Sequence, residues 1–136
     1  MTNIELITKA LLKIGVINES ETPSAEQGID ALAELNALME EWDEAGIRLG
    51  WSEQTDLSET APLPPYAERG VTLMLALALA PSYGGAASVT EALVGDARMA
   101  YDRLHRKAML NNLKEADSRN LPAAEGGVSN FNILTG

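Results

Sequence analysis

The residues from Ala25 to Gly46 carry the pattern that most constrains how this chain folds. Apolar side chains recur every three or four positions along the stretch, with acidic residues between them. That spacing places the apolar side chains on one face of an α-helix. The predicted buried positions are Ile29, Leu32, Leu35, Met39 and Trp42. We therefore expect a long amphipathic helix that packs against a protein core.

The same stretch has signals for both helix ends. Two N-cap patterns precede it: Thr22-Pro23, with proline at the first helical position, and Ser24 with Gln27, which fits a capping box one register later. Gly46 suits the left-handed conformation that closes many helices. The helix is therefore expected to be bounded by its own local sequence.

Three further stretches are predicted to be helical. They span residues 2–14, residues 66–80 and residues 88 to about 116. Thr2 with Glu5, and Ser88 with Glu91, form capping boxes at the starts of the first and the last. Pro81, followed by glycines, is expected to break the middle one. The predicted buried faces are Ile4, Ile7, Leu11 and Ile14 in the first, and Leu93, Ala97, Ala100, Tyr101, Leu104 and Ala108 in the last.

The composition agrees with a mainly helical fold. Ala and Leu are abundant, and there are only two Trp, three Tyr and one Phe. Ala and Leu favour helices, whereas aromatic and β-branched residues favour strands. The alternating apolar residues of 66–80 could also form a strand, but Leu, Met and Ala are less typical of strands than Val and Ile. We predict an all-α, four-helix bundle-like domain over residues 1–117, with a projecting loop at 47–65 and an extended C-terminal arm at 118–136.

The 47–65 loop and the arm are the segments expected to contact other proteins. Pro62, Pro64 and Pro65 exclude regular helix in the loop, which is predicted to project or to form a small hairpin. Its apolar residues Trp51 and Leu57 are expected to face a neighbouring subunit or another protein rather than the core of their own chain.

The arm lacks helix signals, yet it ends in an apolar stretch, so we expect it to pack on another chain as an added strand. Its predicted contact residues are Leu121, Val128, Phe131, Asn132, Ile133 and Leu134.

The charge and the rare residue types exclude several functions. A net charge of −10 argues against DNA or an anionic membrane as the main partner of the whole surface. The chain has no cysteine and one histidine, so we predict no disulfide, no metal site and no cofactor. No secretory signal is visible and the apolar runs are too short to span a bilayer, so the protein is expected to be soluble and intracellular when made.

Two charged clusters are candidate sites. The first is Glu40, Glu41, Asp43 and Glu44, where paired carboxylates could hydrolyse a glycoside if one of them lay in an apolar pocket. A solvated helix face is the simpler interpretation of the same residues. No nucleophile motif or phosphate-binding loop is present, so we predict no catalytic residue.

The second cluster is basic and lies on one side of the last helix. Arg103, Arg106 and Lys107 gather there, whereas residues 19–59 contain 12 acidic residues and one basic residue. This asymmetry predicts head-to-tail association of subunits, in which the basic cluster meets Glu40 and Glu44 of a neighbour. Pairing within one chain would give the same pattern, and contact with nucleic acid is the other alternative.

Four features occur in an order that resembles a known family. They are LLKIGV at 11–16, EEWDEAGI at 40–47, LALALAPSYG at 75–84, and a long helix followed by a Gly-rich tail. Together they resemble the head-to-tail adaptors of tailed bacteriophages, called packaged-DNA stabilisation proteins in short-tailed phages. The resemblance covers nearly the whole chain, although its motifs concern packing and capping rather than chemistry.

The resemblance implies a structural virion protein at the portal vertex, assembled in the host cytoplasm. Such adaptors form a ring, generally of twelve, under the portal protein. The ring extends the channel for double-stranded DNA, helps to retain the genome and holds a tail or nozzle protein. The C-terminal arm would then bind the portal. The alternatives are a virion-associated peptidoglycan hydrolase that uses Glu40 or Glu41, and a helical regulatory or chaperone protein.

Overall fold

The computed structural model describes the backbone of residues 1–120 and the side chains of residues 1–117. This part of the chain is an all-α bundle of four α-helices with two short 3₁₀ turns and without strands. The α-helices are α1 (Asn3–Lys13), α2 (Ala25–Glu44), α3 (Glu68–Tyr83) and α4 (Glu91–Asn120). The 3₁₀ turns are η1 (Pro65–Ala67) and η2 (Gly84–Ala86), at the two ends of α3. The predicted fold class is confirmed.

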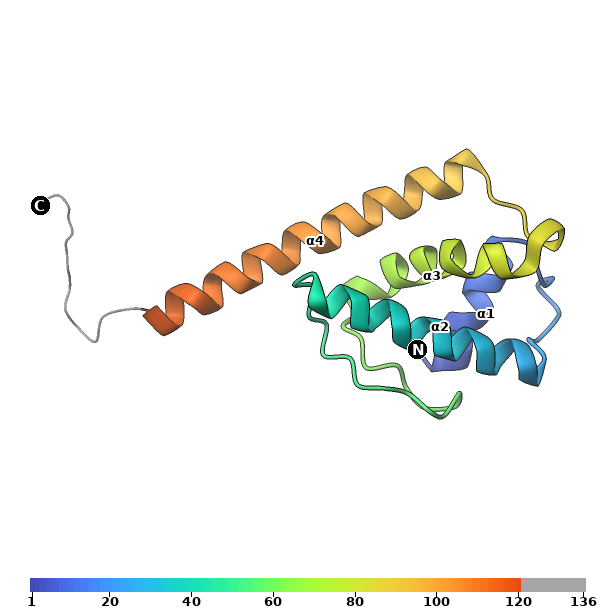
Figure 1. Ribbon diagram of the computed structural model, residues 1–136, viewed down its shortest axis with the longest axis horizontal. Helices are drawn as coiled ribbons and strands as arrows, with labels where there is room; N and C mark the ends of the chain where they lie inside the picture. Colours follow the sequence, from blue (N-terminus) through green and yellow to red (C-terminus); the bar gives the residue numbers. More distant parts are fainter. Residues whose placement is uncertain (121–136) are drawn as a thin grey trace, which may run out of the picture.

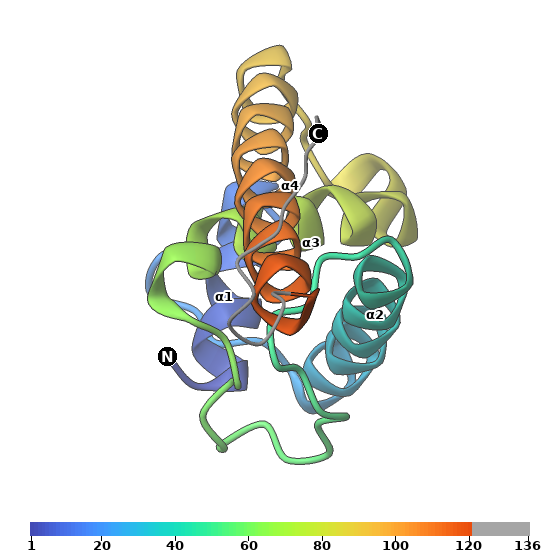
Figure 2. The ribbon, with the colours of Figure 1, turned by 90° about the vertical axis from the view of Figure 1, so that its left-hand side faces the viewer.

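Helix α3 is the centre of the bundle. It packs against α1, α2 and α4, so each of its faces meets protein (Figures 1 and 2). No side chain from Gly70 to Ala80 is fully exposed, which is typical of a helix surrounded by other elements. Gly70 lets α4 approach, because a Cβ atom there would lie 2.6 Å from a methyl carbon of Leu104. The alternating Leu and Ala residues therefore form a buried helix and not a strand.

Helix α2 has the predicted ends and most of the predicted face. Its N-cap is Ser24, whose hydroxyl accepts a hydrogen bond from the backbone N–H of Gln27 in a complete capping box. At the other end, Gly46 has φ +94°, and the N–H of Ile47 reaches back to the carbonyl of Trp42 at 2.9 Å, as in a Schellman motif. Leu32, Leu35, Met39 and Trp42 are buried.

The prediction for Ile29 is wrong, because its side chain is 62% exposed. The buried arc of α2 instead begins at Gly28 and Ala31. Leu57 of the following loop packs over Gly28. The Gly28 side of α2 is therefore buried, and Ile29 lies on the outer face. The register of the face thus depends on a contact from another segment.

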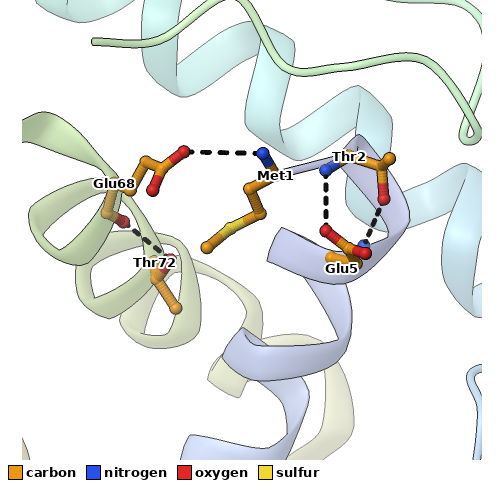
Figure 3. A network of polar contacts seen from close by, with 5 residues as sticks. All are labelled: Met1, Thr2, Glu5, Glu68 and Thr72. Atoms are coloured by element: carbon orange, nitrogen blue, oxygen red, sulfur yellow. Dashed lines mark hydrogen bonds and ion pairs between the residues drawn. The ribbon is translucent and has the colours of Figure 1, made fainter. Parts of the chain in front are cut away.

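Helix α1 begins with the predicted capping box between Thr2 and Glu5 (Figure 3). The adjoining amino group of Met1 lies 3.7 Å from a carboxylate oxygen of Glu68, at the start of α3. The hydroxyl of Thr72 donates to the backbone carbonyl of Glu68, one turn earlier in α3. Of the predicted α1 face, Ile7, Leu11 and Ile14 are buried, and Ile4 is half-buried. The start of the chain is thereby fixed between α1 and α3.

Three predicted helix ends differ from the observed ones. Helix α3 continues through Pro81 to Tyr83 and ends at Gly84, since a proline in the last turn removes only one backbone hydrogen bond. The cap of α4 is Thr90 and not Ser88: the Thr90 hydroxyl accepts from the N–H of Leu93, while the N–H of Ser88 donates to the carbonyl of Ile14. At its other end α4 continues to Asn120, so residues 118–120 are helical and not part of an arm.

Helix α4 is longer than the bundle that supports it. Figure 1 shows its C-terminal part extending beyond the other three helices. Leu93, Ala97, Ala100, Leu104 and Ala108 are buried as predicted, and Tyr101 is half-buried with its ring centroid 5.2 Å from that of Trp42. Near the point where α4 leaves the bundle, the side-chain amide of Asn112 donates to the carbonyl of Gly46 at 3.1 Å.

Candidate protein-binding surfaces

The 47–65 loop is held by the first residues of the chain. Thr2 and Thr60 form an isolated antiparallel bridge. The N–H of Asn3 donates to the carbonyl of Glu59, and the N–H of Ile4 to that of Leu57, each at 2.9 Å. These main-chain bonds place the loop along the side of the bundle opposite α4 (Figure 1).

Asn36, on the outer side of α2, is the second anchor of the loop. Its side-chain oxygen accepts from the indole N–H of Trp51 at 3.0 Å and from the backbone N–H of Gln54 at 2.9 Å. Its amide group donates to the carbonyl of Gln54 at 2.9 Å. Gln54 in turn accepts from the side chain of Asn3, which is fully buried at the start of α1. This network was not predicted from the sequence, although the polar Asn3 at the start of an amphipathic helix was a usable signal.

Replacing Asn36 by alanine is expected to release the loop while the bundle stays folded. Three hydrogen bonds disappear and two half-buried donors lose their acceptor, so we expect a loss of about 1–3 kcal/mol in the free energy of unfolding. Amide hydrogen exchange should accelerate at residues 51–57. The exposed Glu34→Ala on the same helix is the matched control. Unchanged exchange in the loop of the Asn36 variant would show that the network does not hold it.

Trp51 and Leu57 both pack against the core of their own chain, so the expectation that they avoid it is wrong. Leu57 fits the space that Gly28 leaves on α2, with its Cδ1 atom 2.9 Å from where a Cβ would stand. Trp51 is held by Asn36. Each side chain is nevertheless only half-buried, and contact of the remaining surface with a neighbour stays a prediction.

An acidic groove lies between the outer side of α2 and the loop. Its volume is about 520 Å³. Ala33 and Ala37 of α2 and Leu49 and Trp51 of the loop supply apolar walls. The charged residues that line it are Glu40, Asp43 and Glu53, and none of the lining residues is basic. We refer to this feature as the acidic groove. It offers apolar surface beside three carboxylates, of which Asp43 is paired with Arg48, and this suits a basic amphipathic partner.

The four carboxylates of the predicted acidic cluster are all exposed. Glu40 and Asp43 line the acidic groove, whereas Glu41 and Glu44 do not. The hydrolase alternative needs a carboxyl group in an apolar pocket, and none of these four is desolvated in that way. Within residues 1–117, the structure groups no three His, Asp or Glu side chains that could hold a metal ion.

Among residues 1–117, the pKa values of Asp56 and Tyr83 depart from their ordinary values. Hydrogen bonds from the hydroxyl and the backbone N–H of Ser58 hold the pKa of Asp56 below its ordinary value, which reflects a tight turn in the loop. Burial, with a smaller contribution from the charge of Asp30, raises the pKa of Tyr83. These shifts report local packing rather than a reactive site.

The basic residues of α4 form an exposed surface. Arg103 and Lys107 line a small groove with Arg69 and Tyr66, between α4 and the start of α3. The ammonium nitrogen of Lys107 lies 4.4 Å from the centre of the Tyr66 ring. Arg106 is exposed beside this groove and does not line it. The predicted clustering of basic side chains on one side of α4 is therefore seen in the structure.

Within residues 1–117, the predicted inter-subunit charges have no ion-pair partner in the same copy of the chain. In the part that the structure describes, Arg103, Arg106 and Lys107 form no ion pair, and neither do Glu40 and Glu44. Ion pairs within residues 1–117 join Met1 to Glu68, Arg48 to Asp43, and Arg69 to Asp96. Pairing of the two clusters within one chain, which the sequence left open, is therefore not observed.

The predicted contact residues of the arm, from Leu121 to Leu134, lie outside the described residues.

Within residues 1–120, no helix is both long and apolar enough to cross a membrane.

Comparison with known proteins gives one family. A family model described as P22 tail accessory factor matches residues 1–135, which is nearly the whole chain. The search of curated proteins with this chain found no match. A small all-α protein with charged, unpaired outer surfaces is consistent with a virion component that binds other proteins, and the chain belongs to the P22 tail accessory factor family of short-tailed phage tail proteins.

Proposed function

We propose that this protein is a head-to-tail adaptor. In this proposal it forms a ring, of about twelve subunits, that docks under the portal protein. The ring extends the DNA channel, helps to retain the packaged genome and provides the platform for the next tail or nozzle protein. Membership of a phage tail family supports the virion location. The finer roles follow from the resemblance to adaptors and from the surfaces described above.

One observation carries this proposal: the unpaired opposite charges on separate surfaces of one chain. Arg103, Arg106 and Lys107 lie on α4, while Glu40 and Glu44 lie on α2, and the two groups are not joined within the described chain. Surfaces that differ in this way favour head-to-tail contacts, and such contacts close into rings when the rotation between subunits allows it. A symmetric pairing of two copies would instead place each surface against itself.

The overall charge also suits a channel component. A net charge of −10 repels DNA phosphates, so DNA would pass without specific binding. The proposed contact of the arm with the portal uses residues outside the described range, and its support is the apolar sequence around Phe131. Trp51 is proposed to meet a neighbouring subunit or a tail-side protein with its exposed part.

Binding to the portal tests this function. The protein, mixed with the portal protein of the same phage, is expected to co-sediment with it as one complex of defined stoichiometry. A portal from an unrelated phage serves as the control for unspecific binding. Failure to bind its own portal under conditions in which both proteins are folded would contradict the adaptor function.

A further inference from the structure

Helix α4 carries an exposed apolar stripe that no other segment of residues 1–117 covers. Met99, Leu110 and Leu113 are 55%, 60% and 61% exposed. With Arg103 and Arg106 they form a series at 99, 103, 106, 110 and 113, spaced alternately by four and three residues. That spacing keeps all five on one face of a helix and is typical of a helix that packs on another. We call this face the outer stripe of α4.

Helix α2 has an exposed stripe of matching length. On α2, the exposed residues Ile29, Ala33, Ala37, Glu40 and Glu44 follow one another at intervals of three or four. At 1.5 Å per residue, each stripe is about 20 Å long. Ala33 and Ala37 keep the centre of the α2 stripe shallow, and the same two residues line the acidic groove. The apolar side chains of an incoming helix could therefore enter the groove beside the loop.

The two stripes have opposite charge. Residues 98–114 of α4 contain five basic side chains and one acidic side chain, Asp102. Helix α2 contains seven acidic side chains and no basic one. Each stripe thus combines apolar positions with charges of one sign, and such an arrangement selects a partner of the other sign.

From this complementarity we propose that the outer stripe of α4 docks on the exposed α2 stripe and the adjoining acidic groove of a second copy of the same chain. Met99, Leu110 and Leu113 supply the apolar contact, and Ile29, Ala33 and Ala37 receive it. Arg103 and Arg106 lie beside Glu40 and Glu44 of the neighbour. This inference rests on the proposed function, because the two faces are those through which adjacent subunits of the proposed ring would meet.

The position of the two stripes fits a head-to-tail contact. Helix α4 lies along one side of the bundle, and the loop that forms a wall of the acidic groove lies along the opposite side (Figure 1). A subunit can therefore use its groove toward one neighbour and its α4 toward the other. Leu110 and Leu113 lie on α4 near the Asn112 contact with Gly46, and because they are 60% and 61% exposed they can reach a second copy without disturbing their own core.

A charge-exchange experiment tests the contact. The double variants R103E/R106E and E40K/E44K should each weaken subunit association at least about tenfold, because like charges would meet across the interface. The combined quadruple variant should restore association. All four positions are exposed, so circular dichroism should show an unchanged bundle. Association is measured by analytical ultracentrifugation of the protein alone at high concentration and by native mass spectrometry of its complex with the portal.

Two controls separate a specific contact from an effect of net charge. The variant K9E/K13E on α1 changes the net charge by the same amount as R103E/R106E and should leave association intact. Combining K9E/K13E with E40K/E44K restores the native net charge of −10 without restoring the contact, and it should remain defective. Restoration by this control combination would overturn the proposal.

Photo-crosslinking provides a readout that does not depend on a charge change. A benzophenone side chain placed at position 110 should crosslink to residues 26–53 of another copy. Crosslinks from position 110 to the portal protein instead would assign the outer stripe to that partner and contradict the proposal. Rings that form on the portal but do not respond to the charge exchange would contradict this contact while leaving the adaptor function intact. Absence of both self-association and ring formation would overturn the contact as well.

Discussion

Replacing Leu35 by alanine is expected to lower the free energy of unfolding by about 2–5 kcal/mol, the usual range for truncating a buried leucine. Leu35 has no exposed surface and lies on the face of α2 that packs into the bundle. Its removal leaves a cavity that a helix fixed by caps at both ends cannot readily close. Urea titration followed by circular dichroism measures the change.

Ile29→Ala is the matched control for this experiment. It removes a side chain of similar size from the same helix, but one that is 62% exposed, so the expected loss in the isolated chain is below about 0.5 kcal/mol. The same variant should weaken association between copies. Equal losses at Leu35 and Ile29 in the isolated chain would mean that the buried face of α2 is assigned incorrectly.

Deleting residues 121–136 is expected to abolish binding to the portal while the helical bundle stays folded. The proposed arm presents Phe131 and Ile133 on one side of an extended strand and Leu134 on the other, which suits addition to the edge of a partner sheet. Ordering such a segment costs ~1–2 kcal/mol per residue, so the contact must be extensive. Surface plasmon resonance on immobilised portal measures the affinity, and circular dichroism verifies the fold.

Two further variants make this result specific. Exchanging 121–136 for a Gly/Ser linker of equal length should also abolish binding, which separates sequence from length. Phe131→Ala alone should weaken binding about 30-fold, as expected for loss of an apolar interface anchor worth about 2 kcal/mol. Unchanged affinity after deletion would mean that the bundle itself, and not the arm, binds the portal.

Local signals accounted for much of the fold. The capping box at Thr2 and the left-handed Gly46 are decided by residues within one helical turn, so the sequence sufficed to place them. For α2 the sequence offered both Thr22 and Ser24, and the structure uses Ser24. Ser88 and Thr90 are both suitable N-cap residues, and the local sequence does not indicate which of them precedes α4. The contact of Ser88 with Ile14, far away in the sequence, decides that case.

The candidate surfaces could be predicted from the sequence only in part. Opposite charges on α2 and α4 could be read from composition, but whether they pair within one chain depends on how the helices are arranged. Leu57 was misjudged because the space over Gly28 exists only once α1, α2 and the loop are assembled. For the same reason the apolar pattern of α2 could not reveal that Ile29 lies outside the buried arc.

Electron microscopy of the protein mixed with the portal protein of the same phage tests the adaptor function most directly. We expect a ring of this protein on one end of the portal, coaxial with its channel, with α4 of each subunit against the α2–loop side of the next. The subunit number should match or closely follow that of the portal, generally twelve. Portal particles without added density, or density attached away from the channel axis, would contradict the account.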